Sequence, residues 1–179
     1  MRRRHALLAL AAAGAQRAAW PAPVGELRFP RDHGSHPTWA TEWWYLTGQV
    51  RAEGALWGFQ MTFFRSRVDI AAHMRSAFAA RQLLFAHAAL TDLRGRRLLH
   101  DQRIAREGFG VAQASEQDTA IRLQDWSLTR EDAPVPGHSR YRIEATAQGF
   151  SLQLQATSTQ PVLLQGEGFA SPREAGAVV

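Results

Sequence analysis

Segments in which apolar and polar residues alternate constrain the fold of this chain more than any other feature of its sequence. Residues 140–145 read RYRIEA and residues 150–155 read FSLQLQ, so every second side chain in each segment is apolar. A period of two is the spacing of side chains along one face of a β-strand. Gly149 stands between the segments, where we expect a turn. We therefore predict an antiparallel pair with one buried and one solvated face.

Other segments rich in aromatic and β-branched residues predict further strands. With the pair above, they are 42–50, 56–64, 83–92, 98–106, 121–130 and 162–164. Turns are expected at 51–54 and 93–96, and residues 70–81 fit a loop or a short helix. Roughly eight or nine strands without an amphipathic helix of twelve residues predict an all-β fold, an antiparallel β-barrel or sandwich. The run of hairpins favours an up-and-down barrel.

Composition limits the classes of function. The 179 residues suffice for one domain with a core, and the absence of cysteine excludes disulfides, a thiol nucleophile and Cys-ligated metal. All basic residues other than histidine are arginines. Removing residues 1–15, which carry three arginines and no acid, lowers the formal charge from +5 to +2. The remaining arginines are scattered among acids, so we expect no nucleic-acid partner.

The N-terminal residues 1–15 read MRRRHALLALAAAGA, a basic start followed by an apolar run and an A-x-A site. This pattern is typical of a secretory signal peptide, and the paired arginines also permit twin-arginine export. The apolar run is too short to span a bilayer. An uncleaved anchor on a lipid surface is the main alternative. We expect a periplasmic or secreted protein, with residues 16–28 as a lead-in to the domain.

Residues 29–45, FPRDHGSHPTWATEWWY, gather the side chains best suited to chemistry. Histidine and carboxylates can move protons or bind metal, and tryptophans can line an apolar pocket. The spacing of His33, His36 and Glu42 does not match the H-E-x-x-H zinc motif, and Gly34 and Pro37 oppose a shared helix, which weakens a metal site. His87 could join them in space or be a hydrogen-bonded core residue.

Glu42 opens a predicted strand, and alternation places Glu42 and Trp44 on one face and Trp43 and Tyr45 on the other. If the first face points inward, burial in an apolar lumen raises the pKa of Glu42 and suits it to proton donation. The alternative is a buried ion pair with an arginine such as Arg65 or Arg103.

Other reaction classes find less support. The serines lack a G-x-S-x-G context, and residues 108–110, GFG, lack the strand–loop–helix setting of a phosphate loop. We therefore expect neither catalysis by a serine nucleophile nor a nucleotide cofactor.

Residues 29–50 together with GFQMTFFR, QLLFAHAALTD, RIAREGFGVA, LQDWSL and PVLLQGEGFAS resemble the AttH/CrtC-like family. That family includes carotenoid 1,2-hydratase and exported proteins named as secreted hydrolases. The resemblance implies a lipocalin-like β-barrel or sandwich over residues 29–171 and a second such domain in tandem. Residues 172–179 would then be a truncated tail with the second domain absent, so we expect an exposed inter-domain patch and self-association.

The resemblance implies acid-assisted hydration of an apolar isoprenoid, in which water captures a carbocation, without metal or organic cofactor. The hydratase hypothesis makes Asp32, His33, Glu42 and Tyr45 the catalytic candidates and His36, Trp43, Trp44 and His87 the ligand-binding candidates. The alternative is a noncatalytic carrier or envelope factor linked to lipoprotein or lipid export. Its partners would be an apolar small molecule or lipid, a membrane surface or a transporter complex. A secreted hydrolase ranks third because no nucleophile motif is visible.

Overall fold

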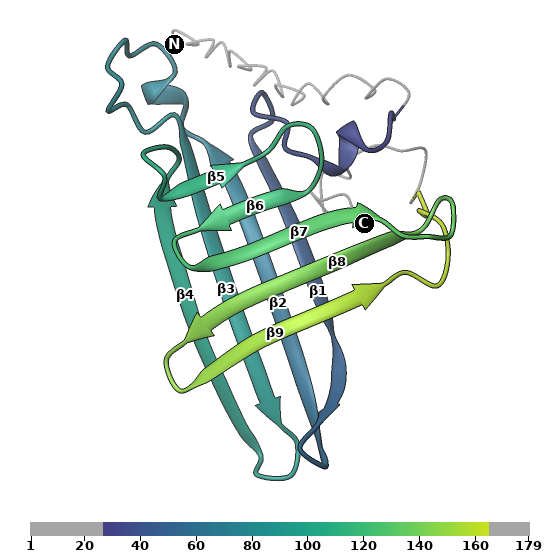
Figure 1. Cartoon of the computed structure of the whole chain (residues 1–179). Helices are drawn as coiled ribbons and strands as arrows, with labels where there is room; N and C mark the ends of the chain where they lie inside the picture. The colour runs from purple at the N-terminus through teal and green to yellow at the C-terminus, as the bar shows by residue number, and fades with distance from the viewer. Residues whose placement is uncertain (1–26, 165–179) are drawn as a thin grey trace, which may run out of the picture.

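Nine antiparallel strands in two sheets account for most of the structure, a computed structural model that describes residues 27–164 (Figure 1). The predicted signal peptide and the predicted tail, residues 1–15 and 172–179, lie outside the described residues, as does most of the lead-in. The strands therefore confirm the all-β prediction. Within the described part of the chain, no helix is long and apolar enough to cross a membrane.

The first sheet, sheet A, is built from consecutive hairpins in the order β1-β2-β3-β4. Its strands are β1 (Thr41–Ala52), β2 (Ala55–Arg67), β3 (Gln82–Asp92) and β4 (Arg97–Arg106). Glu53 and Gly54 form the first turn, and both have positive φ, as a tight hairpin turn requires. The connection from β2 to β3 carries a short 3-10 helix, η2 (Asp69–Ala71), which fits the loop predicted there.

The second sheet, sheet B, continues as a meander in the order β5-β6-β7-β8-β9. Its strands are β5 (Ala112–Ala114), β6 (Ala120–Leu123), β7 (Trp126–Asp132), β8 (Ser139–Ala147) and β9 (Phe150–Thr157). The alternating segments described above form β8 and β9, with Ile143 opposite Leu154 and Gly149 in the turn at φ +88°. That pair is confirmed, including its buried face.

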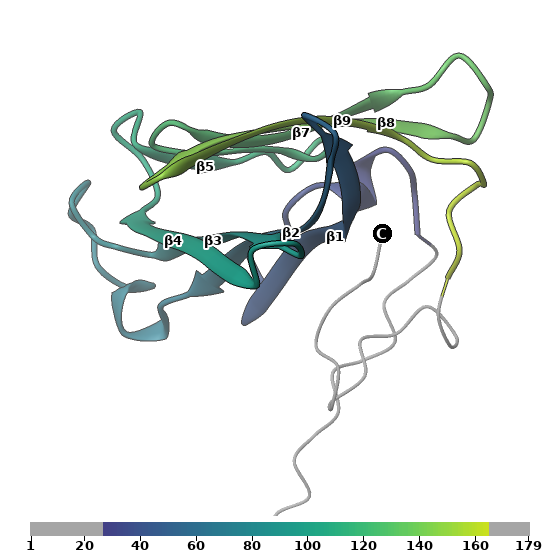
Figure 2. The ribbon, with the colours of Figure 1, turned by 90° about the horizontal axis from the view of Figure 1, so that it is seen from below.

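The two sheets lie in separate layers, and the strands of sheet B run obliquely across those of sheet A (Figures 1 and 2). Inward-facing apolar side chains of both sheets fill the space between the layers. The buried cluster comprises Met61, Phe63, Leu84, Ala86, Ala88, Ala112, Ala114, Ile121, Leu123, Trp126, Leu128, Ile143, Ala145 and Leu152. Each large side chain removed from water stabilises the fold by roughly 1.5–3 kcal/mol, so this cluster holds the layers together.

The expected up-and-down barrel does not form, because the described strands split into two sheets. The split occurs between β4 and β5, where Gly108, Phe109 and Gly110 all have positive φ. Such backbone is accessible to glycine and strained for most other residues. This sharp corner carries the chain from one layer to the other, so the architecture is a lipocalin-like β-sandwich.

Two strand predictions need correction, and one strand was not predicted. Residues 121–130 are not one strand, because Gln124 has φ +58° and turns the chain between β6 and β7. Residues 162–164 form no strand in the structure, and Leu163 and Leu164 are exposed. Strand β5 was not predicted, because its Ala-Gln-Ala sequence has low β propensity.

Candidate functional site

A buried ion pair between Glu42 and Arg65 lies at the start of β1. The two residues are directly opposite each other in the β1–β2 register, and Arg65 Nε donates to Glu42 Oε2 at 2.5 Å. Their side chains are 7% and 1% exposed. The other nitrogens of Arg65 donate to the carbonyls of His36 and Trp39 and to Oε1 of Gln82 at 2.6 Å. The guanidinium is thus paired and hydrogen-bonded, as burial of a charge requires.

His36 links this pair to a second carboxylate. Its backbone N–H lies 2.8 Å from both oxygens of Glu42, and its Nδ1 lies 2.6 Å from Glu42 Oε1. Its Nε2 lies 3.0 Å from Asp32 Oδ1, and the ring of Trp39 stacks on the imidazole at 4.3 Å. Because both ring nitrogens face carboxylates, both act as donors, which is the protonated form of histidine. We call Asp32, His36, Glu42, Arg65 and Gln82 the clasp.

The pKa directions follow from these contacts. Burial alone would raise the pKa of Glu42, but the hydrogen bonds from His36 and the Arg65 charge outweigh it and lower that pKa below its usual value. The hydrogen bond to Glu42 raises the pKa of His36 despite burial. The expectation that burial raises the pKa of Glu42 is therefore wrong, and the alternative, an ion pair with Arg65, is confirmed. Arg103 pairs with Asp101 instead.

His33 joins the two sheets through its backbone. Its carbonyl oxygen accepts from Trp44 Nε1 of β1 at 3.0 Å and from Thr119 Oγ1, beside β6, at 2.8 Å. The residue is 1% exposed, and its Nδ1 has no hydrogen-bond partner in the described structure. Burial, reinforced by the charge of Arg130, lowers the pKa of the imidazole to about 4. His33 is therefore neutral at physiological pH and acts as a buried anchor.

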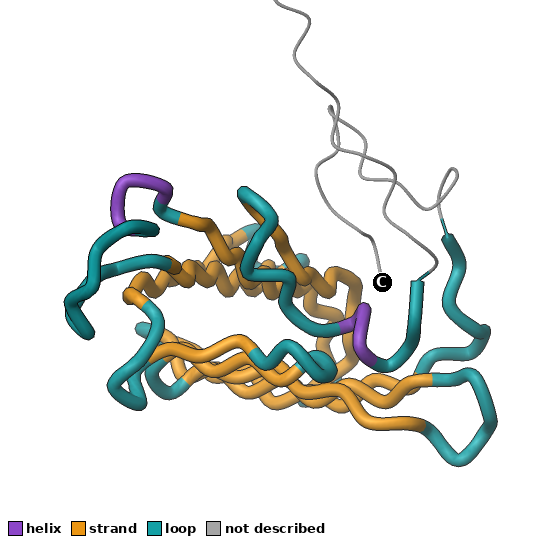
Figure 3. The backbone as a smooth tube through the Cα atoms, turned by 90° about the horizontal axis from the view of Figure 1, so that it is seen from above, coloured by secondary structure: helices purple, strands orange, loops and turns teal. Residues whose placement is uncertain are grey.

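The segment around His33 also fits tightly against sheet B. Ser35 donates its N–H to the carbonyl of Ser115 at 2.7 Å. A Cβ on Gly34 would lie 2.8 Å from the backbone carbon of Glu116, closer than side-chain carbons approach. The glycine thus permits close contact between the 3-10 turn η1 (Arg31–His33) and the β5–β6 connection. Seen from above, η1 lies at one end of the two layers (Figure 3).

The predicted site residues therefore separate into two groups. One group comes together around η1 and the start of β1: Asp32, His33, His36, Glu42 and Trp44. The register places Trp43, Tyr45 and His87 on the opposite face of sheet A, because they alternate with inward-facing neighbours. Tyr45 is 37% exposed and His87 is exposed, so the interpretation of His87 as a core residue is wrong.

That opposite face carries a row of large apolar residues. Trp43, Phe64, Phe85 and Ile104 are consecutive partners across β1, β2, β3 and β4. The next row holds Tyr45, Thr62, His87 and Gln102. Ile104 is 58% exposed, Trp43, Phe64 and Phe85 are half-buried, and Thr62 in the second row is buried. We call these two rows the outer face of sheet A.

Sequence reasoning missed Phe64, Phe85 and Ile104 on this face and Gln82 in the clasp. The apolar run in residues 83–90 offers no alternation that separates the inner from the outer side. Pairing Trp43 with Phe64 would have required the hairpin register, which the turn at 53–54 sets. The sequence thus contained the residues of this apolar row, but their alignment across the strands could be predicted only once the position of the turn at residues 53–54 was known.

The clasp offers little to a metal ion. Both nitrogens of His36 already donate to carboxylates, so neither has a lone pair for coordination. Among residues 27–164, no group of three or more histidines and acids is arranged to hold a metal ion. The carboxylate of Glu42 is ionised and saturated by donors, so it has no proton to give. Asp32 and His36, at 16% and 14% side-chain exposure, are the accessible end of the network.

Comparisons with known proteins place these features in a family. The sequence model of the AttH-like family matches residues 21–177. The crystal structure of a provisionally assigned AttH protein from Nitrosomonas europaea is 40% identical, covers 84% of this chain and aligns with a TM-score of 0.68. The match covers 43% of that protein, so this chain spans less than half of the length of its solved relative. No functionally curated protein matches the chain.

Proposed function

This chain belongs to the AttH-like family, and from this premise we propose that it is a noncatalytic envelope module that binds an apolar chain on the outer face of sheet A. The ligand class is an isoprenoid or acyl chain, free or attached to a partner of a lipid-export system. The clasp then holds the fold and does not perform chemistry. One observation carries this proposal: the uncharged aromatic row on the outer side of an otherwise ordinary sandwich.

The outer face of sheet B provides the contrast that makes this row informative. Antiparallel sheets normally present polar residues to solvent, and sheet B does so at every outward position except Ala120. The polar residues are Gln113, Arg122, Ser127, Thr129, Glu131, Arg140, Arg142, Glu144, Thr146, Ser151, Gln153, Gln155 and Thr157. The outer face of sheet A has neither acid nor arginine in its two central rows. Exposed apolar patches of this kind mark binding surfaces.

The row also has dimensions that suit a chain-like ligand. Four side chains on adjacent strands, with strands about 4.8 Å apart, extend over roughly 14 Å. Phe64 in the first row meets the ring of His87 in the second row edge-on, with ring centroids 5.5 Å apart, so these two ring planes pack against each other on the outer face. An extended apolar chain lying across the strands would bury methylene groups against these planes, at roughly 0.8 kcal/mol for each fully buried group.

Acid-assisted hydration of an isoprenoid is the second candidate, favoured by the proton that His36 holds beside the partly exposed Asp32. The raised pKa of His36 makes it a weak acid, however, and protonation of an alkene demands a strong one. The Glu42 carboxylate, the acid first expected for this step, is ionised. Incubation with an acyclic carotenoid tests this candidate: a hydrated product would favour it, and unchanged carotenoid would favour the binding module.

Export is part of the proposal and depends on residues 1–15. Secretion by the Sec or twin-arginine route would deliver the domain to the periplasm or beyond, where a lipid-binding envelope module would act. N-terminal sequencing of the mature protein tests this step. A start after Ala15 supports export with cleavage, and a start at Met1 contradicts it.

Binding of a fluorescent polyene fatty acid tests the proposed surface. We expect saturable binding by the chain, weakened at least tenfold by Ile104→Ser, because that side chain is 58% exposed and its loss should leave the fold intact. Phe85→Ser should act in the same direction. Thr129→Ser on the outer face of sheet B is the matched control and should bind like the unaltered chain. Equal affinity in all variants would overturn the proposed surface.

Self-association is a separate prediction about the same face. Two copies could bury their aromatic rows against each other, which would compete with the ligand. Sedimentation velocity with and without the polyene probe measures this competition. Dissociation of oligomers on ligand addition would support a shared surface, whereas monomeric behaviour throughout would contradict the self-association prediction and leave the ligand surface to the binding assay.

A further inference from the structure

A second apolar surface lies at the end of sheet A, on loops that the proposed function does not use. Phe78, in the β2–β3 connection, and Phe109, in the β4–β5 connection, stack with ring centroids 5.4 Å apart. They are 73% and 60% exposed, although both are large aromatic residues. Ile70 and Met74, in the same connection as Phe78, are 88% and 51% exposed. We call these four residues the aromatic tip.

Contacts from Arg106 and Arg81 hold the two loops of the aromatic tip in position. The Arg106 guanidinium lies 4.3 Å from the centroid of the Phe109 ring and 5.7 Å from that of Phe78. It also donates from Nη1 to the carbonyl of Phe78 at 2.9 Å, and Arg81 donates to the carbonyl of Met74. The exposed rings are therefore held in place before any partner arrives, which reduces the entropy lost on binding.

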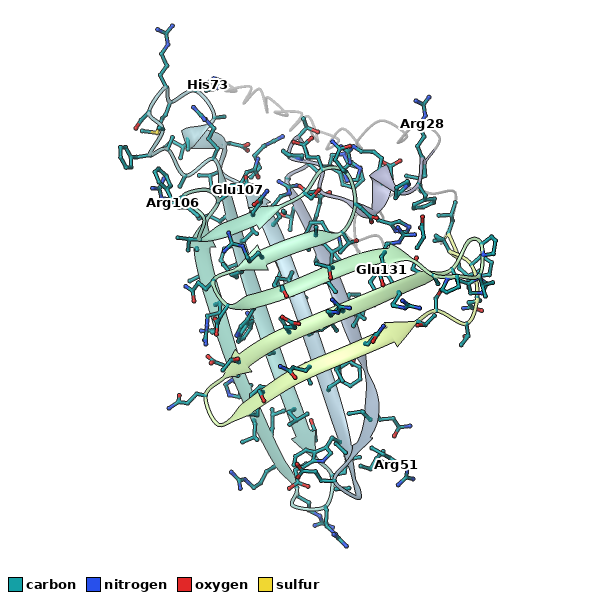
Figure 4. The ribbon with its side chains drawn as sticks, in the orientation of Figure 1. Arg28, Arg51, His73, Arg106, Glu107 and Glu131 are labelled. Carbon is teal, nitrogen blue, oxygen red and sulfur yellow. The ribbon has the colours of Figure 1, made fainter. Side chains whose placement is uncertain are left out.

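The charge around the tip is positive. Residues 67–81 and 106–111 contain four arginines against two acids, and one of the acids, Asp69, is paired with Arg67 at 2.6 Å. Figure 4 places His73, Arg106 and Glu107 at this end of the molecule and Arg51 at the opposite end. Exposed aromatic rings with arginines beside them are the combination that suits the interface of an anionic bilayer, where rings sit at headgroup level and guanidinium groups meet phosphates.

The shape of the tip favours a bilayer over a protein partner. A stable protein interface buries roughly 800 Å² on each side, which needs a broad complementary surface. The aromatic tip consists of a few side chains on two loops that project from the end of the strands (Figure 1). A bilayer accepts single side chains between its lipids, so a small projecting cluster is sufficient.

We propose that the aromatic tip docks this protein on the surface of an anionic lipid bilayer, with Phe78 and Phe109 inserted at headgroup depth and Arg75, Arg81 and Arg106 facing phosphates. In this orientation, the end of sheet A that carries η2 contacts the membrane. Its outer face stays clear of the bilayer plane and can receive an apolar chain extracted from it. The tip and the outer face consist of different residues, so each proposal can fail without the other.

Sedimentation with lipid vesicles tests the docking. Vesicles of phosphatidylglycerol and phosphatidylcholine should bind the chain at low salt, and pure phosphatidylcholine vesicles should bind it at least tenfold more weakly. The double variant Phe78→Ser/Phe109→Ser should lose at least tenfold in affinity for the anionic vesicles. Arg75→Gln should weaken binding about twofold to fivefold and reduce its salt dependence.

The opposite end of sheet A supplies the matched control. Leu93 and Leu98, at the β3–β4 turn, are 50% and 61% exposed and also lie among arginines. The double variant Leu93→Ser/Leu98→Ser should bind anionic vesicles like the unaltered chain. Equal losses in both double variants, or no vesicle binding at low salt, would overturn the proposal. Urea unfolding of each variant establishes that it is folded, and polyene binding by the tip variant should be unchanged.

Discussion

The strand residues of the clasp, Glu42, Arg65 and Gln82, lie on the same strands as the outer face of sheet A but on the other side of the sheet, and the two regions differ in burial, charge and hydrogen bonding. Glu42 and Trp43 are neighbours in β1 and point to opposite sides of the sheet. The Glu42 carboxylate accepts hydrogen bonds from His36 and Arg65 and is buried. Trp43, by contrast, begins a row of large apolar side chains that ends at the exposed Ile104. The residue types best suited to chemistry are therefore already hydrogen-bonded and paired with one another in this protein.

Arg65→Met is expected to have the largest effect on stability. It leaves the ionised Glu42 buried without its main partner, and removal of one member of a buried ion pair costs about 3–5 kcal/mol. Urea unfolding measures the change. The matched control is Arg67→Met, two residues along β2, whose ion pair with Asp69 is solvent-exposed and contributes about 0–1 kcal/mol. Similar losses of unfolding free energy in both variants would contradict the claim that the buried Arg65 pair matters more to stability than the exposed Arg67 pair.

Stability should also depend on pH through His33. Its folded-state pKa of about 4 lies below the ordinary 6.5, so the unfolded chain takes up a proton first as the pH falls. The free energy of unfolding therefore decreases between pH 6.5 and about pH 4, by about 1.5 kcal/mol from pH 6.5 to pH 5, because the slope approaches its limiting value of about 1.4 kcal/mol per pH unit only below pH 6.5. His33→Leu should remove the slope between pH 6.5 and pH 5, above the range in which the carboxylates Glu42 and Asp32 are protonated, and a persistent slope in that interval would contradict the assignment.

His36 acts in the opposite direction, because its pKa is raised in the folded state. Its contribution is fully present below pH 6.5 and is lost as the pH rises through the folded-state pKa. Stability should thus pass through a maximum near neutral pH. An NMR titration of the His36 ring measures the raised pKa directly, and a value below 6.5 would contradict the two-carboxylate geometry.

Gly34→Ala should destabilise the protein by about 1–3 kcal/mol, because the new methyl group meets the backbone of Glu116 at 2.8 Å and neither backbone can move freely. Thermal unfolding measures the loss. Gly54→Ala is an unsuitable control because of its positive φ, whereas Ala72→Ser, at an exposed position in the β2–β3 connection, should change stability by less than about 0.5 kcal/mol. Equal melting temperatures for Gly34→Ala and the unaltered chain would contradict the close packing described for η1.

The sequence contained enough information for the strands and for some of the contacts. Period two in residues 140–155 predicted β8, β9 and their buried face, because alternation on a half-buried strand is unambiguous. The same rule separated Glu42 from Trp43. Choosing between Arg65 and Arg103 as the partner of Glu42 was not possible, because both lie on strands and the choice depends on which strand pairs with β1.

Other features lie beyond sequence patterns for physical reasons. His87 sits in an apolar run whose two sides differ only in packing, so its exposure could not be deduced. The division into two sheets depends on three consecutive left-handed residues, and only two of them, Gly108 and Gly110, are glycines. The saturation of Glu42 depends on the loop from Gly34 to Ala40 folding back over Arg65, which is a tertiary contact.

Polyene binding by Glu42→Gln, compared with Ile104→Ser, tests most directly whether the clasp is structural and the outer face binds. Glu42→Gln should lower the free energy of unfolding by about 2–4 kcal/mol, since it removes the charge that Arg65 and His36 share. Under conditions where it remains folded, it should bind the probe with unchanged affinity, while Ile104→Ser loses at least tenfold with little change in stability. The reverse pattern, in which Glu42→Gln abolishes binding and Ile104→Ser retains it, would contradict both assignments.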